Sequence, residues 1–124
     1  MGLDSYALAV PQEDFIDCFS FRGSEKCFSM AEDYSEEFRE IFYSRKNYFI
    51  ECWMSNLFRK KGGVKQFNCS FIQLTKEDLF AFKQYIKEEK DFEQEYTVQQ
   101  AERLLSEAKI YLEEGKLVYY YSSW

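Results

Sequence analysis

Residues 117–124 read Leu117-Val118-Tyr119-Tyr120-Tyr121-Ser122-Ser123-Trp124, an apolar and aromatic stretch with no polar tail behind it. The ends of most domains are a few polar, loosely held residues. Aromatic and β-branched residues favour strands. The stretch therefore predicts a C-terminal strand that is tied into a β-sheet.

Other stretches also have the character of strands. In Ser5–Val10, larger apolar side chains alternate loosely with small ones, which predicts a short strand that Pro11 ends. Phe67–Leu74 carries apolar residues on both faces, which predicts a central strand. Phe15–Phe21 fits either another strand or a turn of helix. Residues 24–40 mix charged and aromatic side chains, and we expect a loop that runs into a helix.

Helices are expected between these strands. Apolar residues at helical spacing predict a helix from about Ile41 to Lys61, which Gly62-Gly63 ends. Thr75 can cap the backbone N–H three residues on and so begin a second helix. Thr97–Gln100 resembles another capping box and predicts the start of a third helix, which Gly115 ends. The inward-facing residues of the second helix are expected to be Leu79, Phe82 and Ile86.

The size and the order of elements predict the architecture. A chain of 124 residues is long enough for one domain with its own core, and we take residues 1–124 as a single domain. The fold class is expected to be α+β. A small, mainly antiparallel or mixed sheet of N-terminal, central and C-terminal strands would pack against about three helices.

The composition limits the partners and the compartment. The formal charge is −6, which disfavours direct binding to nucleic acid because phosphate binding needs a basic surface. No apolar run is long enough to span a membrane. None of the four cysteines forms a CxxC pair and no signal peptide precedes them, so we expect a cytoplasmic protein without zinc or disulfides. Cys52 and Cys69 are interpreted as small core side chains.

The residue types exclude several kinds of catalysis. The chain contains no His, so it lacks the commonest acid–base residue and metal ligand, and Ser–His and Cys–His nucleophile pairs are excluded. It has no Gly-rich phosphate loop. Adjacent carboxylates such as Glu113-Glu114 do not face each other on a helix and are typical of a solvated surface. We therefore assign no catalytic residue, no metal ligand and no cofactor.

Several polar and aromatic side chains lie among apolar positions and are candidates for binding. An Arg with aromatic rings suits a nucleotide or another small anion. A structural role stays open for each of them, since a Trp on an inward stripe is more often a core residue and Asp4 can cap a turn or pair with Arg45. The candidate binding residues are Asp4, Tyr43, Arg45, Glu51, Trp53 and Trp124.

Three short stretches, in this order along the chain, carry a resemblance to a known family. They are Met1–Tyr6, then Tyr43–Lys46 running to Ile50 and Trp53, then Val118–Trp124. Together they resemble a family of small uncharacterised phage and prophage proteins. Those proteins typically open MGLDMYL, carry YWRK followed by I-H-x-W, and close with YY-x-SSW.

This chain departs from the family pattern at three positions. Ser5 stands in place of the usual Met, Ser44 in place of the usual Trp, and Glu51 in place of the usual His. The family has no established activity to carry over. The resemblance implies an origin in a phage or prophage, a compact α+β domain, and both termini within the fold.

Two functions from different classes follow. The first is a small acidic phage-encoded accessory protein that binds a host or phage protein, for example as an inhibitor of host defence such as an anti-CRISPR protein. It predicts an exposed apolar or aromatic patch of more than about 300 Å². The second is a small-molecule binding protein or enzyme whose pocket is formed by Asp4, Tyr43, Arg45, Glu51 and Trp53. A homodimer, paired through the C-terminal strand, also stays open.

Overall fold

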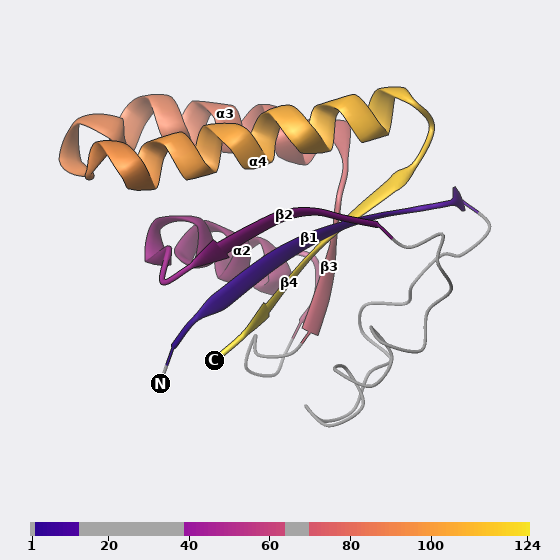
Figure 1. The fold of residues 1–124 in the computed structure, drawn as a ribbon, viewed down its shortest axis with the longest axis horizontal. Coiled ribbons are helices and arrows are strands. Elements are labelled where there is room, and N and C mark those ends of the chain that lie inside the picture. The colour runs from indigo at the N-terminus through magenta and orange to yellow at the C-terminus, as the bar shows by residue number, and fades with distance from the viewer. Residues whose placement is uncertain (1, 13–38, 64–69) are drawn as a thin grey trace.

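The computed structural model of the protein describes residues 2–12, 39–63 and 70–124 (Figure 1). Within these ranges, one four-stranded sheet has the strand order β2-β1-β4-β3, and each neighbouring pair is antiparallel. The N-terminal and C-terminal strands are therefore the two central strands. The strands are β1 (Asp4–Val10), β2 (Arg39–Arg45), β3 (Ser70–Leu74) and β4 (Leu117–Ser123).

The helices of the described residues pack against one face of this sheet. In Figure 1, α3 and α4 run side by side along the top of the molecule, and α2 lies nearer the strands. The helices are α2 (Tyr48–Lys60), α3 (Lys76–Glu89) and α4 (Glu95–Glu113), with a short 3-10 helix, η2 (Lys90–Phe92), between the last two. The fold class predicted from the sequence, a small sheet packed against about three helices, is confirmed.

A continuous core fills the space between the helices and this face of the sheet. Strands contribute alternate residues because successive side chains of a strand point to opposite faces. Buried side chains of the core include Ala7, Phe42, Ile72, Val118 and Tyr120 from the strands, and Ile50, Met54, Phe58, Phe82, Ala101 and Leu104 from the helices.

The opposite face of the sheet is aromatic. The ring of Tyr121 lies 5.8 Å from that of Tyr6 and 4.9 Å from that of Phe71, measured between centroids. Tyr119 and Tyr121 are buried on this face, while Tyr120 between them belongs to the helix-covered core. The C-terminal strand predicted from its aromatic residues is thus confirmed, and its side chains serve both faces of the sheet.

Several predicted boundaries are confirmed with their physical causes. β1 ends at the residue before Pro11. The Thr75 hydroxyl accepts a hydrogen bond from the backbone N–H of Asp78 at 3.2 Å, and the Asp78 carboxylate accepts one from the Thr75 N–H at 2.9 Å. This capping box begins α3. Gly115, just beyond α4, has a φ of 85°, which only glycine adopts without strain.

The predicted helix from Ile41 to Lys61 is wrong over its first part. Residues 39–45 form β2, and α2 begins only at Tyr48. Phe42 lies seven residues before Phe49, so the two fit one face of a helix. In β2, however, buried Phe42 and Ser44 stand on either side of exposed Tyr43, as the period of a strand requires. The Asn47 side chain accepts a hydrogen bond from the Ile50 N–H at 3.1 Å and so sets the true start of the helix.

The strand within Phe67–Leu74 is at the edge of the sheet and not in its centre. β3 pairs with β4 and has no second neighbour in the described sheet. Phe71 and Ile72 are nevertheless both fully buried, one on each face. The apolar pattern correctly indicated that both faces of this strand are buried. Burial of both faces does not distinguish an edge strand from a central one.

Two smaller predictions are also wrong. α4 begins at Glu95, so Thr97 lies within its first turn and caps nothing, and Gln94 at the N-cap makes no side-chain cap hydrogen bond. Cys52 is exposed on α2 and is not a core side chain. In both cases a local pattern was compatible with the assignment, but the tertiary packing placed the residue elsewhere.

Some predictions fall on residues that the structure does not describe. Phe15–Phe21, most of the segment 24–40, the beginning of the strand at Phe67 and the side chain of Cys69 lie outside the described residues. No helix in residues 2–12, 39–63 and 70–124 is long and apolar enough to cross a membrane.

Candidate functional site

The candidate residues lie at three separate places in the structure. One pair joins β1 to β2, and a second pair joins α2 to the C-terminal end of β4. Trp53, on α2, belongs to neither pair and packs against α3. The pairs are Asp4 with Tyr43, near Arg45, and Glu51 with Trp124.

The first place is the paired ends of β1 and β2. Asp4 lies opposite Arg45 in the register, and the Tyr43 hydroxyl donates a hydrogen bond to Asp4 Oδ1 at 2.8 Å. This hydrogen bond is the main cause that raises the pKa of Tyr43. The Arg45 guanidinium lies close to the backbone of Gly2. Asp4 and Arg45, which the sequence suggested as a pair, are thus directly opposite each other on neighbouring strands. The hydrogen bond that Asp4 accepts is nevertheless donated by Tyr43.

The second place is a hydrogen-bond network around Glu51. Its Oε1 accepts from the Tyr120 hydroxyl at 2.9 Å, and its Oε2 accepts from Ser122 Oγ at 3.0 Å and from Trp124 Nε1 at 3.1 Å. The Tyr120 hydroxyl also lies at hydrogen-bond distance, 2.9 Å, from Ser5 Oγ. The network therefore joins α2, β1 and the C-terminal end of the chain.

Burial and hydrogen bonding act in opposite directions on this carboxylate. Burial raises the pKa of Glu51, and the hydrogen bonds from Tyr120, Ser122 and Trp124 lower it, with a net rise. Burial and the nearby Glu51 charge raise the pKa of Tyr120 well above its ordinary value. A raised carboxyl pKa is common at functional sites. Here both oxygens already accept hydrogen bonds from the protein, so the carboxylate mainly attaches β4 to α2.

The stretches on which the family resemblance rests meet in this network. Ser5 comes from the opening stretch, Glu51 from the middle one, and Tyr120, Ser122 and Trp124 from the closing one. Sequence reasoning selected Glu51 and Trp124 as separate candidates. It missed Tyr120 and Ser122, although their two-residue spacing before Trp124 places the three on one face of a strand.

The third place is the contact between α2 and α3. The Trp53 ring lies 4.8 Å from that of Phe82 and 6.4 Å from that of Tyr85, measured between centroids. Burial raises the pKa of Tyr85 to about 12, and its hydroxyl donates a hydrogen bond to the Phe49 carbonyl at 3.0 Å. Trp53 therefore packs between two helices, which is the structural role that the sequence analysis left open for it.

The structure also shows three exposed aromatic side chains that sequence reasoning missed, and we call them the aromatic end. Tyr48 begins α2, Phe92 ends η2 and Tyr96 lies in the first turn of α4. Their side chains are 62%, 81% and 67% exposed. Asn47 Nδ2 donates to the Thr97 carbonyl at 3.2 Å and holds the beginnings of α2 and α4 together. A signal was present, since Phe92 and Tyr96 lie among charged residues and outside any apolar stripe.

Neither metal chemistry nor known relatives point to a function. In the three described ranges, no three Cys, Asp or Glu side chains are grouped so that they could hold a metal ion. Comparisons of the chain with protein-family models, with curated proteins and with solved structures find no match. The function must therefore be inferred from the residues of this chain.

Proposed function

We propose that this is a small acidic phage-encoded accessory protein that acts by binding a host or phage protein, with inhibition of a host or defence protein as the expected consequence. The observation that supports it best is the aromatic end. Large aromatic side chains on a protein surface are characteristic anchors of protein–protein interfaces. The phage origin rests on the sequence resemblance.

The aromatic end offers exposed rings on backbone that a hydrogen bond helps to hold in place. Burying one such ring on docking contributes about 2–3 kcal/mol before the costs of association. Tyr48 and Tyr96 each lie beside a residue of the Asn47–Thr97 hydrogen bond, and Asn47 also caps α2. Side chains held on a fixed backbone lose less entropy when they bind.

The charges around this surface indicate what the partner looks like. Five exposed carboxylates outnumber the exposed lysines near this surface, which are Lys46, Lys87 and Lys90. An acidic rim favours a basic partner surface and speeds the encounter with it, so a basic groove that otherwise holds nucleic acid is a fitting target. The exposed acidic residues are Glu88, Glu89, Asp91, Glu93 and Glu95.

Affinity capture from a lysate of the host bacterium tests the proposal. The full chain is the bait, Phe92→Ser/Tyr96→Ser is the variant, and Ile110→Ser is the control, since Ile110 is also exposed but lies elsewhere on α4. We expect the wild type and the control to capture one protein partner with saturable binding. The variant should bind the same partner with at least a tenfold lower affinity. A folded bait without a saturable partner would contradict the proposal.

The alternative, a pocket for a nucleotide-like anion, gains no support from the geometry. It requires Arg45, Glu51 and Trp53 to converge on one cleft, but Glu51 binds the end of β4 and Trp53 packs against α3. Pairing of the C-terminal strand with a second copy is also disfavoured, because β4 already pairs with both β1 and β3.

A further inference from the structure

A groove of about 490 Å³ lies between the exposed sides of α3 and α4. Its apolar lining comes from both helices, and Phe80 adds a ring that is 69% exposed. Leu105 and Leu112, on α4, are only partly buried although they pack against the core. An apolar side chain docked in this groove would therefore cover surface that water now contacts.

The charged residues that line the groove are mostly basic, although the chain carries a net charge of −6. Lys76 and Lys83 line it from α3 and Lys109 from α4, against a single carboxylate, Glu113. Within the described ranges no ion pair joins these lysines to an acidic side chain, since the salt bridge found there is Lys61–Asp78. The positive charge of the groove is therefore available to a ligand.

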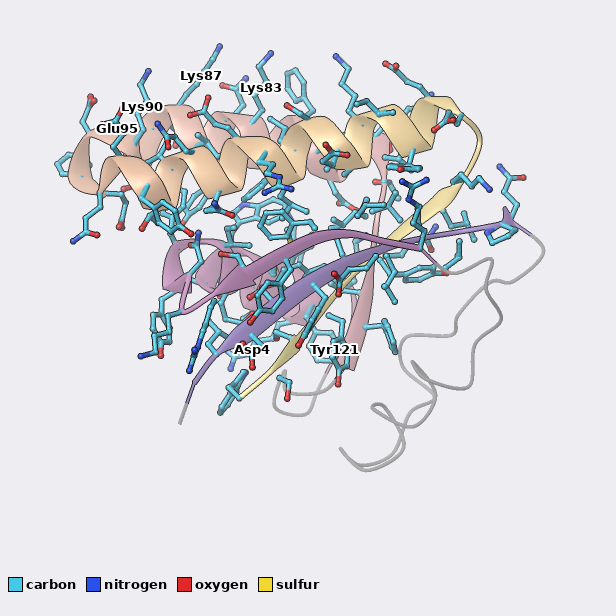
Figure 2. All side chains as sticks on the ribbon, in the orientation of Figure 1. Asp4, Lys83, Lys87, Lys90, Glu95 and Tyr121 are labelled. Carbon is cyan, nitrogen blue, oxygen red and sulfur yellow. The ribbon has the colours of Figure 1, made fainter. Side chains whose placement is uncertain are left out.

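The basic character continues along α3. Lys76, Phe80, Lys83, Lys87 and Lys90 are spaced alternately four and three residues apart, so they lie on one stripe of the helix. Figure 2 shows Lys83 and Lys87 of α3, and Lys90 of η2, projecting away from the sheet. The stripe runs along the outer side of the groove and extends beyond it.

We propose that this groove binds an acidic amphipathic helix of a partner protein. The inference rests on the proposed function, because it names a second surface and the chemistry of what that surface binds. A third helix can lay one apolar ridge between two packed helices. Lysines on both walls then complement Asp and Glu on either side of that ridge.

The dimensions and the charges favour this ligand over others. The α4 residues that line the groove run from Leu105 to Glu113, which corresponds to about 12 Å, or roughly two helical turns. An acidic helix can place apolar residues one turn apart on the groove lining. Nucleic acid fits less well, because Glu113 lines the groove and the whole chain is acidic.

The groove and the aromatic end are separate surfaces. The groove uses the N-terminal half of α3 and the C-terminal half of α4, whereas Phe92 and Tyr96 lie where α3 passes into α4. In Figure 1 these are opposite ends of the α3–α4 pair. The two surfaces can therefore be tested with different variants.

Selection from a displayed library of helix-constrained 16-residue peptides, with the full chain as target, tests the inference. We expect enriched peptides to be acidic and to carry apolar residues at i, i+4 and i+7. Lys83→Glu/Lys109→Glu should weaken their binding about tenfold, because each reversal removes an attraction and adds a repulsion. Lys46→Glu/Lys60→Glu makes the same charge change at exposed lysines outside α3, η2 and α4 and should change affinity less than twofold.

Several results would overturn the inference. These are no enrichment, enrichment of peptides that are not acidic, and equal binding to both charge variants. Self-association that sedimentation detects and Lys83→Glu/Lys109→Glu abolishes would assign the groove to a second copy of this chain. The proposed function fails separately, because capture through the aromatic end depends on Phe92 and Tyr96 and not on these lysines.

Discussion

At the scale of single residues, the carboxylate of Glu51 is the acceptor on which the end of β4 depends. Two of its three donors, the hydroxyls of Tyr120 and Ser122, belong to fully buried residues. A buried donor without an acceptor costs more than the hydrogen bond itself contributed. Replacements at this position should therefore differ according to whether they can still accept hydrogen bonds.

Glu51→Leu is expected to lower the free energy of unfolding by about 2–4 kcal/mol. It leaves the buried Ser122 hydroxyl and the Trp124 N–H without the acceptor they use, and it leaves the Tyr120 hydroxyl with Ser5 alone. Glu51→Gln should cost about 1 kcal/mol or less. Its amide oxygen can accept from Ser122 and Trp124, and its amide nitrogen can donate to the oxygen of Tyr120, whose own proton is then directed to Ser5. Urea unfolding of both variants checks this, and an equal loss in the two would contradict it.

The raised pKa of Glu51 predicts a dependence of stability on pH. The folded protein binds the proton more tightly than the unfolded chain does, for which the ordinary pKa of 4.5 applies. The contribution of Glu51 to stability is then fully present below pH 4.5 and is lost as the pH rises through the folded-state pKa.

Relative to Glu51→Gln, the wild type should therefore lose stability as the pH rises from 4.5 through that window and then stay level. The measurement is the free energy of unfolding of both proteins between about pH 4 and 8, in a buffer of constant ionic strength. Curves that stay parallel over the whole range would show that Glu51 titrates alike in the folded and the unfolded state.

At the scale of elements, β1, β4, α3 and most of α4 could be predicted because each has an unambiguous period or terminal signal. β2 could not be predicted, because a run of seven residues is short enough to fit the period of a helix and that of a strand. Phe42 and Phe49 would lie on one face of a continuous helix, but they belong to β2 and α2. The decisive signal was Asn47, whose side chain caps α2 two residues after β2 ends.

The two capping boxes predicted from the sequence provide an internal comparison. Thr75→Ala should lower the free energy of unfolding by about 1 kcal/mol, because the Thr75 side chain caps the first turn of α3. Thr97→Ala should change it by less than about 0.5 kcal/mol, because α4 already begins at Glu95. Thermal unfolding of the two variants is the measurement, and similar losses would contradict the observed helix start.

At the scale of the whole molecule, the meeting of candidate residues depends on strand pairing. Glu51 and Trp124, and Asp4 and Tyr43, come together only because β1 lies between β2 and β4. Residue patterns carry no information on strand order, so the residues could be selected from the sequence but their grouping could not. The aromatic end was missed because its residues come from separate segments, α2 and the η2–α4 region, which the Asn47–Thr97 hydrogen bond joins.

Removal of residues 122–124 should lower the free energy of unfolding by about 3 kcal/mol or more, because it deletes two of the three donors to the Glu51 carboxylate. Removal of Trp124 alone deletes one exposed donor and should cost about 1–2 kcal/mol. Denaturant unfolding of both truncated chains, with the full chain as reference, is the measurement. A 122–124 deletion as stable as the full chain would show that the network adds nothing to the fold.

The central position of β1 and β4 also determines how the protein folds and opens. Tyr120 and Ser5, in contact across these strands, are 115 residues apart in sequence. The pair can form only after nearly the whole chain has been closed into a loop, which predicts slow folding. Because β1 and β4 each pair with a strand on both sides, their backbone amides should be among the slowest in the protein to exchange with solvent. A single backbone cut anywhere between the two strands would leave fragments that must reassociate to restore the sheet.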